Sequence, residues 1–70
     1  MPDLQTGPRY RVGDRLQVRI GSPLVGTVTE VRYTPFGSGQ VFYRLYVPMD
    51  PEPLMLEVRE DEVECLVPHA

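Results

Sequence analysis

Short alternating segments, repeatedly interrupted by glycine or proline, constrain this chain more than any other feature. Within residues 15–20, Leu16, Val18 and Ile20 share one face of an extended chain, and arginine or glutamine occupies the other. A period of two is typical of a half-buried strand, because successive side chains of a strand point to opposite sides. Segments this short cannot bury themselves as helices, so the pattern predicts an all-β protein built as a small barrel.

The same pattern predicts four further strands and one turn. The strands are expected over residues 25–33, 41–47, 54–59 and 64–67, with a single 3-10 turn over residues 60–63. A short helix over residues 60–67 is the alternative, since Val63, Leu66 and Val67 also fit helical spacing. We favour the turn and the strand, because a barrel needs a fifth strand to cover its edge.

Two features of the second segment predict local distortions. Val28 and Val31 are three residues apart, so a regular pleat cannot turn both inward, and a bulge near residues 29–30 would restore the alternation. Gly26 has no side chain, which suits a place where two strands approach closely. Both features favour the bending that a small barrel requires.

The third segment, residues 41–47, carries apolar side chains on both faces. The expected inner face consists of Tyr43, Leu45 and Val47. A barrel has only one interior, so the aromatic and arginine side chains on and near the outer face are candidates for partner binding: Tyr33, Phe36, Phe42, Arg44 and Tyr46. Such groups stack on, and make cation–π contacts with, peptides, nucleobases or methylated cations. The alternative is that the N-terminal tail or the loop over residues 34–40 covers Phe42 and Tyr46.

The length of 70 residues restricts the chain to one small domain. We expect an N-terminal tail over residues 1–9, a barrel over residues 10–67 and a C-terminal tail over residues 68–70. A domain near this size buries roughly 60% of its unfolded surface, and its core stabilises it by only about 3–5 kcal/mol. Such a domain has no room for a deep catalytic cleft. It must act through its surface, or build a site together with further copies of itself.

Charge is distributed unevenly along a chain of net charge −3. Residues 1–35 hold five arginines and three acidic residues, whereas residues 36–70 hold two arginines and seven acidic residues. A dipolar surface favours an oriented protein partner over a polyanion. The acidic total disfavours nucleic acid, because phosphate neutralisation supplies most non-specific affinity. The alternative is that the charges only keep the outer faces solvated.

Residues capable of catalysis or metal binding are few. Cys65 is the only cysteine, which excludes an internal disulfide, and its apolar surroundings predict a small buried side chain. His69 stands next to the last residue, and the two serines lie in expected turns, so no Ser–His or Cys–His pair is expected. The acidic run over residues 57–64 lacks the spacing of an EF-hand. We therefore expect no cofactor, no metal site and no enzymatic activity in a single copy.

Location follows from what the sequence lacks. No stretch reaches membrane-spanning length, and the amino end lacks a charged start followed by an apolar core. We therefore expect a cytoplasmic protein without a membrane partner.

The order of turn and core residues resembles the SH3-like small-barrel superfamily over residues 12–67. The residues that carry the resemblance are Gly13-Asp14 before Leu16 and Val18, Gly26 before Val28 and Val31, the alternation of residues 43–47, and the acidic turn over residues 60–64. That superfamily includes KOW and Tudor-like modules and accessory subunits of redox and photosynthetic complexes. The resemblance implies a five-stranded barrel with a 3-10 turn before its last strand, and a binding role.

A second resemblance, over residues 13–15 and the closing strand, is to the type II dihydrofolate reductases. Those enzymes build one active pore from four barrels and use a Val-Gln-Ile-Tyr strand. Here residues 55–58 read Met-Leu-Glu-Val, and the chain has no lysine, so the activity does not carry over.

The sequence is therefore compatible with three functions. The first is a non-catalytic binding module or accessory subunit that docks a protein partner through the outward aromatic and arginine face. The second is a KOW-like module that binds RNA or DNA, supported by base stacking on aromatics. The third is a homo-oligomeric enzyme whose site forms between barrels. We favour the first, because the outward aromatics and the uneven charge fit a protein partner and no catalytic group is evident.

Overall fold

The computed structural model describes residues 8–33 and 39–68, and these form five strands and one 3-10 turn. The elements are β1 (Arg15–Ile20), β2 (Ser22–Tyr33), β3 (Val41–Val47), β4 (Leu54–Arg59), η1 (Glu60–Glu62) and β5 (Val63–Val67). The all-β prediction is confirmed, including the turn before the last strand. The alternative helix over residues 60–67 is wrong. β2 begins three residues earlier than predicted, because Gly21 alone, at φ +77°, makes the turn from β1.

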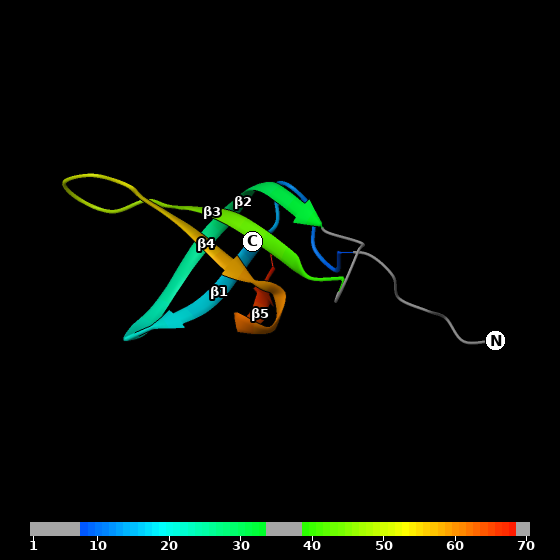
Figure 1. The fold of residues 1–70 in the computed structure, drawn as a ribbon. Coiled ribbons are helices and arrows are strands. Elements are labelled where there is room, and N and C mark those ends of the chain that lie inside the picture. The colour runs from blue at the N-terminus through cyan, green and yellow to red at the C-terminus, as the bar shows by residue number, and fades with distance from the viewer. Residues whose placement is uncertain (1–7, 34–38, 69–70) are drawn as a thin grey trace.

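The strands form one antiparallel sheet in the order β4-β3-β2-β1-β5 (Figure 1). Side chains from β1 and β4 meet in one core, so the sheet curls around them. Within the described residues the two edge strands, β4 and β5, do not pair with each other. The word barrel therefore applies only loosely, and the molecule is a curled open sheet.

The core consists of the inward members of the alternating strands. The buried side chains are Leu16, Val18, Val28, Val41, Tyr43, Leu45, Val47 and Val58. The alternation of residues 15–20 and 54–59 predicts that Ile20 and Leu54 face inward as well, but they are 51% and 37% exposed. Ile20 is the last residue of β1 and Leu54 the first of β4, so both lie at strand ends, where the curled sheet no longer encloses them.

Both predicted distortions of β2 are confirmed. The register between β2 and β3 shifts between Val28 and Glu30, which lets Val28 and Val31 pack on the same core. A Cβ atom on Gly26 would lie 2.9 Å from Leu45 Cβ and 2.9 Å from Val47 Cγ2. Only glycine fits this contact between β2 and β3, because any side chain would displace the neighbouring strand.

Tyr43 anchors the start of the described chain to the sheet. Its hydroxyl donates to Glu60 Oε2 at 2.6 Å and accepts from the backbone amides of Arg9 at 3.1 Å and Tyr10 at 3.2 Å. The Arg9 amide also donates to Glu60 Oε2 at 2.9 Å, and the Tyr10 ring packs edge-on against the Tyr43 ring with centroids 5.5 Å apart. Burial, and then the hydrogen bond to Glu60, raise the pKa of Tyr43 from 10.0 to about 12. These contacts close one end of the core.

Candidate functional site

The outer face of β2, β3 and β4 holds the candidate partner-binding residues in three cross-strand rows. The rows are Arg32–Phe42–Arg59, Glu30–Arg44–Glu57 and Thr27–Tyr46–Met55. Directly opposed residues of an antiparallel sheet lie on the same face, so each row presents its three side chains together. Each of the two end rows has an aromatic side chain on β3, whereas the middle row consists of charged side chains only.

Every arginine on this face is paired with a carboxylate. Arg32 Nη1 lies 2.9 Å from Glu57 Oε2, Arg44 Nη1 lies 3.6 Å from Glu30 Oε1, and Arg59 Nε lies 3.6 Å from Asp61 Oδ1. The side chains in these pairs are well exposed, and such pairs typically contribute only about 0–1 kcal/mol. The centre of the face is therefore electrically balanced, but a partner with its own charges can replace these contacts at little cost.

One end of the face is apolar and uncovered. Tyr46 and Met55 are cross-strand partners and are 40% and 51% exposed. Met49, 46% exposed, lies in the connection of the same hairpin and lines a shallow hollow together with Tyr46, and this connection extends away from the rest of the sheet (Figure 1). We call Tyr46, Met49 and Met55 the arm patch; the exposed Leu54 pairs with the buried Val47 and lies on the other face. Adjacent large apolar side chains that remain exposed are typical of an interaction surface.

The structure brings together three of the five predicted site residues. Phe42, Arg44 and Tyr46 lie on the outer face of β3, where Phe42 is half-buried and the other two are exposed. Tyr33 pairs with the buried Val41 and therefore belongs to the opposite side of the sheet, at the end of β2. Phe36 lies outside the described residues. Tyr33 does not join the group because the bulge in β2 shifts its alternation by one residue.

Sequence reasoning missed Met55 as a member of this surface. The signal was present: strands over residues 41–47 and 54–59 that form a hairpin place residue 46 opposite residue 55, as they do residues 47 and 54. The sequence also allowed the alternative that the N-terminal tail covers Phe42 and Tyr46. Residues 9 and 10 do not do so. These residues bind Tyr43 and Glu60, and Tyr43 faces the core.

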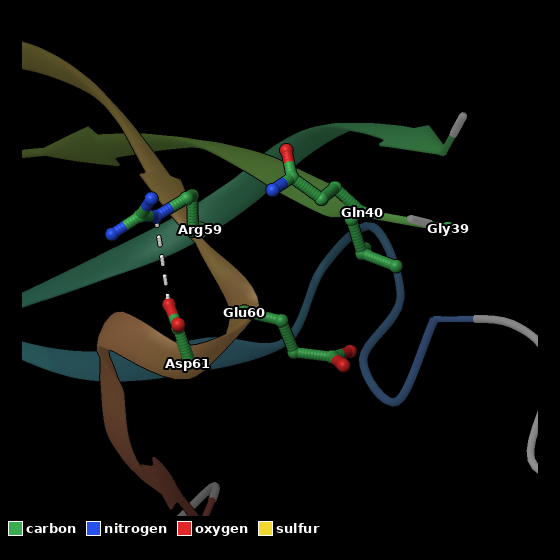
Figure 2. A pocket seen from close by; sticks show the side chains of 6 residues that line it. Gly39, Gln40, Arg59, Glu60 and Asp61 are labelled. Atoms are coloured by element: carbon green, nitrogen blue, oxygen red, sulfur yellow. Dashed lines mark ion pairs between the residues drawn. The ribbon is translucent and has the colours of Figure 1, made fainter. Parts of the chain in front are cut away.

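A small polar pocket of about 210 Å³ lies between β3 and the turn η1, lined by Gly39, Gln40, Val41, Arg59, Glu60 and Asp61 (Figure 2). Its charged groups already have partners inside the protein. Arg59 pairs with Asp61, and Glu60 accepts hydrogen bonds from the Tyr43 hydroxyl and the Arg9 amide. These carboxylates hold the turn and the N-terminal segment, which is a structural task.

On the outer side of β1 and β5, the position of the Cys65 side chain differs from the prediction. Cys65 is exposed, and the expectation of a buried side chain is wrong. It stands opposite Gln17, which lies on the outward face of β1, so the register turns the thiol to the surface. Next to it, hydrogen bonds from Gln17 and Arg19 lower the pKa of the Glu64 carboxyl.

Within residues 8–33 and 39–68, no group of three or more His, Cys, Asp or Glu side chains is arranged to hold a metal ion. Nor does this part of the chain contain a helix of the length and hydrophobicity needed to cross a membrane. His69 lies outside the described residues.

Comparisons with known proteins give no relative for this chain. No protein-family model, no curated protein and no solved structure matches it.

Proposed function

We propose that this protein is a non-catalytic binding module, or an accessory subunit, that docks a protein partner through the outer face of β3 and β4. The observation that carries the proposal is the exposed pair Tyr46 and Met55, with Met49 beside it. Tyrosine and methionine are enriched at the centres of protein interfaces, because they bury a large area and adapt to a partner. The resemblance to SH3-like barrels, many of which are binding modules, supports the same function.

A protein partner fits this face better than nucleic acid does. Arg32, Arg44 and Arg59 each already face a carboxylate within 4 Å, and the whole chain is acidic. Phosphate binding gains its affinity from arginine or lysine charges that a protein leaves uncompensated. A partner with an apolar centre and a mixed polar rim complements this surface instead.

The proposal includes a cytoplasmic location. Cys65 is an exposed free thiol. Such thiols persist in compartments that keep cysteine reduced, whereas oxidising compartments convert them to disulfides.

Quantitative capture from a lysate of the source cells tests this function. We expect wild-type protein to retain a defined partner, and Tyr46→Ala to retain much less of it at unchanged melting temperature. Leu66→Ala is the matched control, because Leu66 is 50% exposed but lies on β5, away from the arm patch.

Three outcomes would contradict the proposal. The first is equal capture by the wild type and Tyr46→Ala. The second is recovery of nucleic acid in place of protein. The third is a ring-shaped homo-oligomer with activity in its central pore, which would favour an enzyme built between copies.

A further inference from the structure

The long central strand β2 divides its pairing between two neighbours. Residues 22–27 pair with β1, and residues 27–33 pair with β3. Only Thr27 takes part in both ladders. Along residues 22–25, β2 therefore has β1 on one side and no described strand on the other, whereas Gly26 already contacts β3.

A groove of about 430 Å³ occupies the unpaired side of β2. Residues 23–25 form one wall, Pro48 and Met49 form the other, and Arg15 and Thr27 lie at the end where β3 begins to pair. The groove exists because the chain leaves β2 after Val47 and runs into the β3–β4 connection. We call this groove the β2 notch.

The backbone of β2 offers hydrogen-bonding groups to a ligand in the notch. Val28 directs its N–H and C=O to residues 14 and 13 on the β1 side, so alternation directs those of Ser22 and Leu24 to β1 and those of Pro23 and Val25 to the groove. Pro23 has no N–H, so the groove presents two carbonyls and the N–H of Val25. These groups suffice to hold a short extended peptide against this edge of β2.

Arg15 gives the notch a charge preference. Four arginines of the sheet, Arg19, Arg32, Arg44 and Arg59, are paired with carboxylates. Arg15 is exposed and has no ion pair among the described residues. An arginine without a carboxylate at the end of a groove lined partly by apolar side chains is complementary to an acidic side chain flanked by apolar ones.

We propose that the β2 notch binds an extended, acidic and apolar segment of a partner protein, which lies along residues 22–25 of β2, hydrogen-bonds to the backbone of Pro23 and Val25, and pairs a carboxylate with Arg15. This rests on the proposed protein-binding function and names the chemistry of the ligand. Arg15, Thr27, Tyr46 and Met55 form one continuous row across four strands, so the notch and the arm patch can contact the same partner.

Selection of a random-peptide display library on the full chain, followed by calorimetry with the selected peptides, tests this inference. We expect the peptides to alternate apolar residues and to share an Asp or Glu, and we expect them to shift the amide resonances of residues 22–27. Arg15→Gln should weaken binding about tenfold, which is the loss expected for one charge-assisted hydrogen-bonded pair, and Arg15→Lys should restore part of it. Arg19→Gln is the matched control on the same face of β1, and it should leave affinity unchanged.

Three results would contradict peptide binding in the β2 notch. These are a library without enriched peptides, enriched peptides without an acidic residue, and resonance shifts confined to β4 or β5. An apparent molecular mass that rises with protein concentration in the wild type, but not in Arg15→Gln, would show that a second copy occupies the notch. Binding of an oligonucleotide that depends on Arg15 would show that nucleic acid binds there. Binding that Tyr46→Ala abolishes and Arg15→Gln leaves intact would overturn the notch while supporting the proposed function.

Discussion

The two ends of β3 differ in how they are closed. At one end the Tyr43 hydroxyl holds Glu60 and the backbone of residues 9 and 10, and the ring of Tyr10 packs against it. At the other end Tyr46 is exposed, and the following Met49 is exposed as well. One strand thus has an end closed by the protein itself and an end that leaves apolar surface uncovered.

The contrast separates stability from binding along a single strand. Burial of Tyr43 and its hydrogen bond to Glu60 stabilise the fold, and its hydroxyl also holds the backbone of residues 9 and 10. The arm patch contributes little to the fold, because its side chains remain largely in water in the folded protein. Substitutions at the two ends should therefore act on different measurements.

The largest effect is expected in the middle of β3, which both ends share. Leu45 is fully buried, and Leu45→Ala should lower the free energy of unfolding by about 2–5 kcal/mol through lost burial and a residual cavity. For a domain of this size, that loss approaches the whole stability, so urea titration at 25 °C should show a largely unfolded protein. A small shift in the urea midpoint would contradict the assigned core.

Gly26→Ala tests the close contact where β2 and β3 meet. The added Cβ would lie 2.9 Å from Leu45 Cβ and 3.2 Å from the Tyr46 carbonyl oxygen. Neither atom is the end of a flexible side chain, so the strands must separate, and overpacking of this kind costs about 1–3 kcal/mol. Thermal unfolding should show the loss, and an unchanged melting temperature would mean that β2 and β3 approach less closely.

Tyr43→Phe should destabilise the closed end by a smaller amount. The ring stays buried, but Glu60 and the Tyr10 amide lose the hydroxyl, which costs about 1–2 kcal/mol. Limited proteolysis should then cleave near residues 9 and 10 faster than in the wild type. Equal cleavage rates would show that the hydroxyl does not hold this segment.

Because the pKa of Tyr43 is raised, we expect the free energy of unfolding to depend on pH in the alkaline range. Folding raises the pKa of Tyr43 from 10.0 to about 12, so its contribution to stability is complete below pH 10 and is lost as pH rises through 12. Urea midpoints measured from pH 9 to pH 12 should fall more steeply for the wild type than for Tyr43→Phe. Parallel curves for the two proteins would contradict the raised pKa.

The two ends also show what the sequence could and could not foretell. Alternation correctly predicted residues 41–47 as a strand and Tyr43, Leu45 and Val47 as its buried side, because period two depends only on local geometry. It could not show that residues 9 and 10 close the Tyr43 end, since that contact joins positions 34 and 33 residues apart in the chain.

Register explains the errors as well as the successes. Cys65 was expected inside because its neighbours are apolar, but its pairing with Gln17 turns it outward. Tyr33 was grouped with Phe42, but its pairing with Val41 places it on the other face. The β2 notch depends on where two ladders end along one strand, and the local sequence carries no such information.

The smallest effect on stability is expected at the open end, with Tyr46→Ala. Its side chain is 40% exposed and lies on the outer face, so truncation removes little burial and leaves no cavity. The melting temperature should stay within the range of ordinary surface substitutions, while partner capture falls. The neighbouring Val47, 4% exposed on the inner face, supplies the matched contrast, because Val47→Ala should lower the melting temperature clearly. If Tyr46→Ala unfolds the protein as readily as Val47→Ala does, the outer face of β3 belongs to the core and the separation between the two ends is wrong.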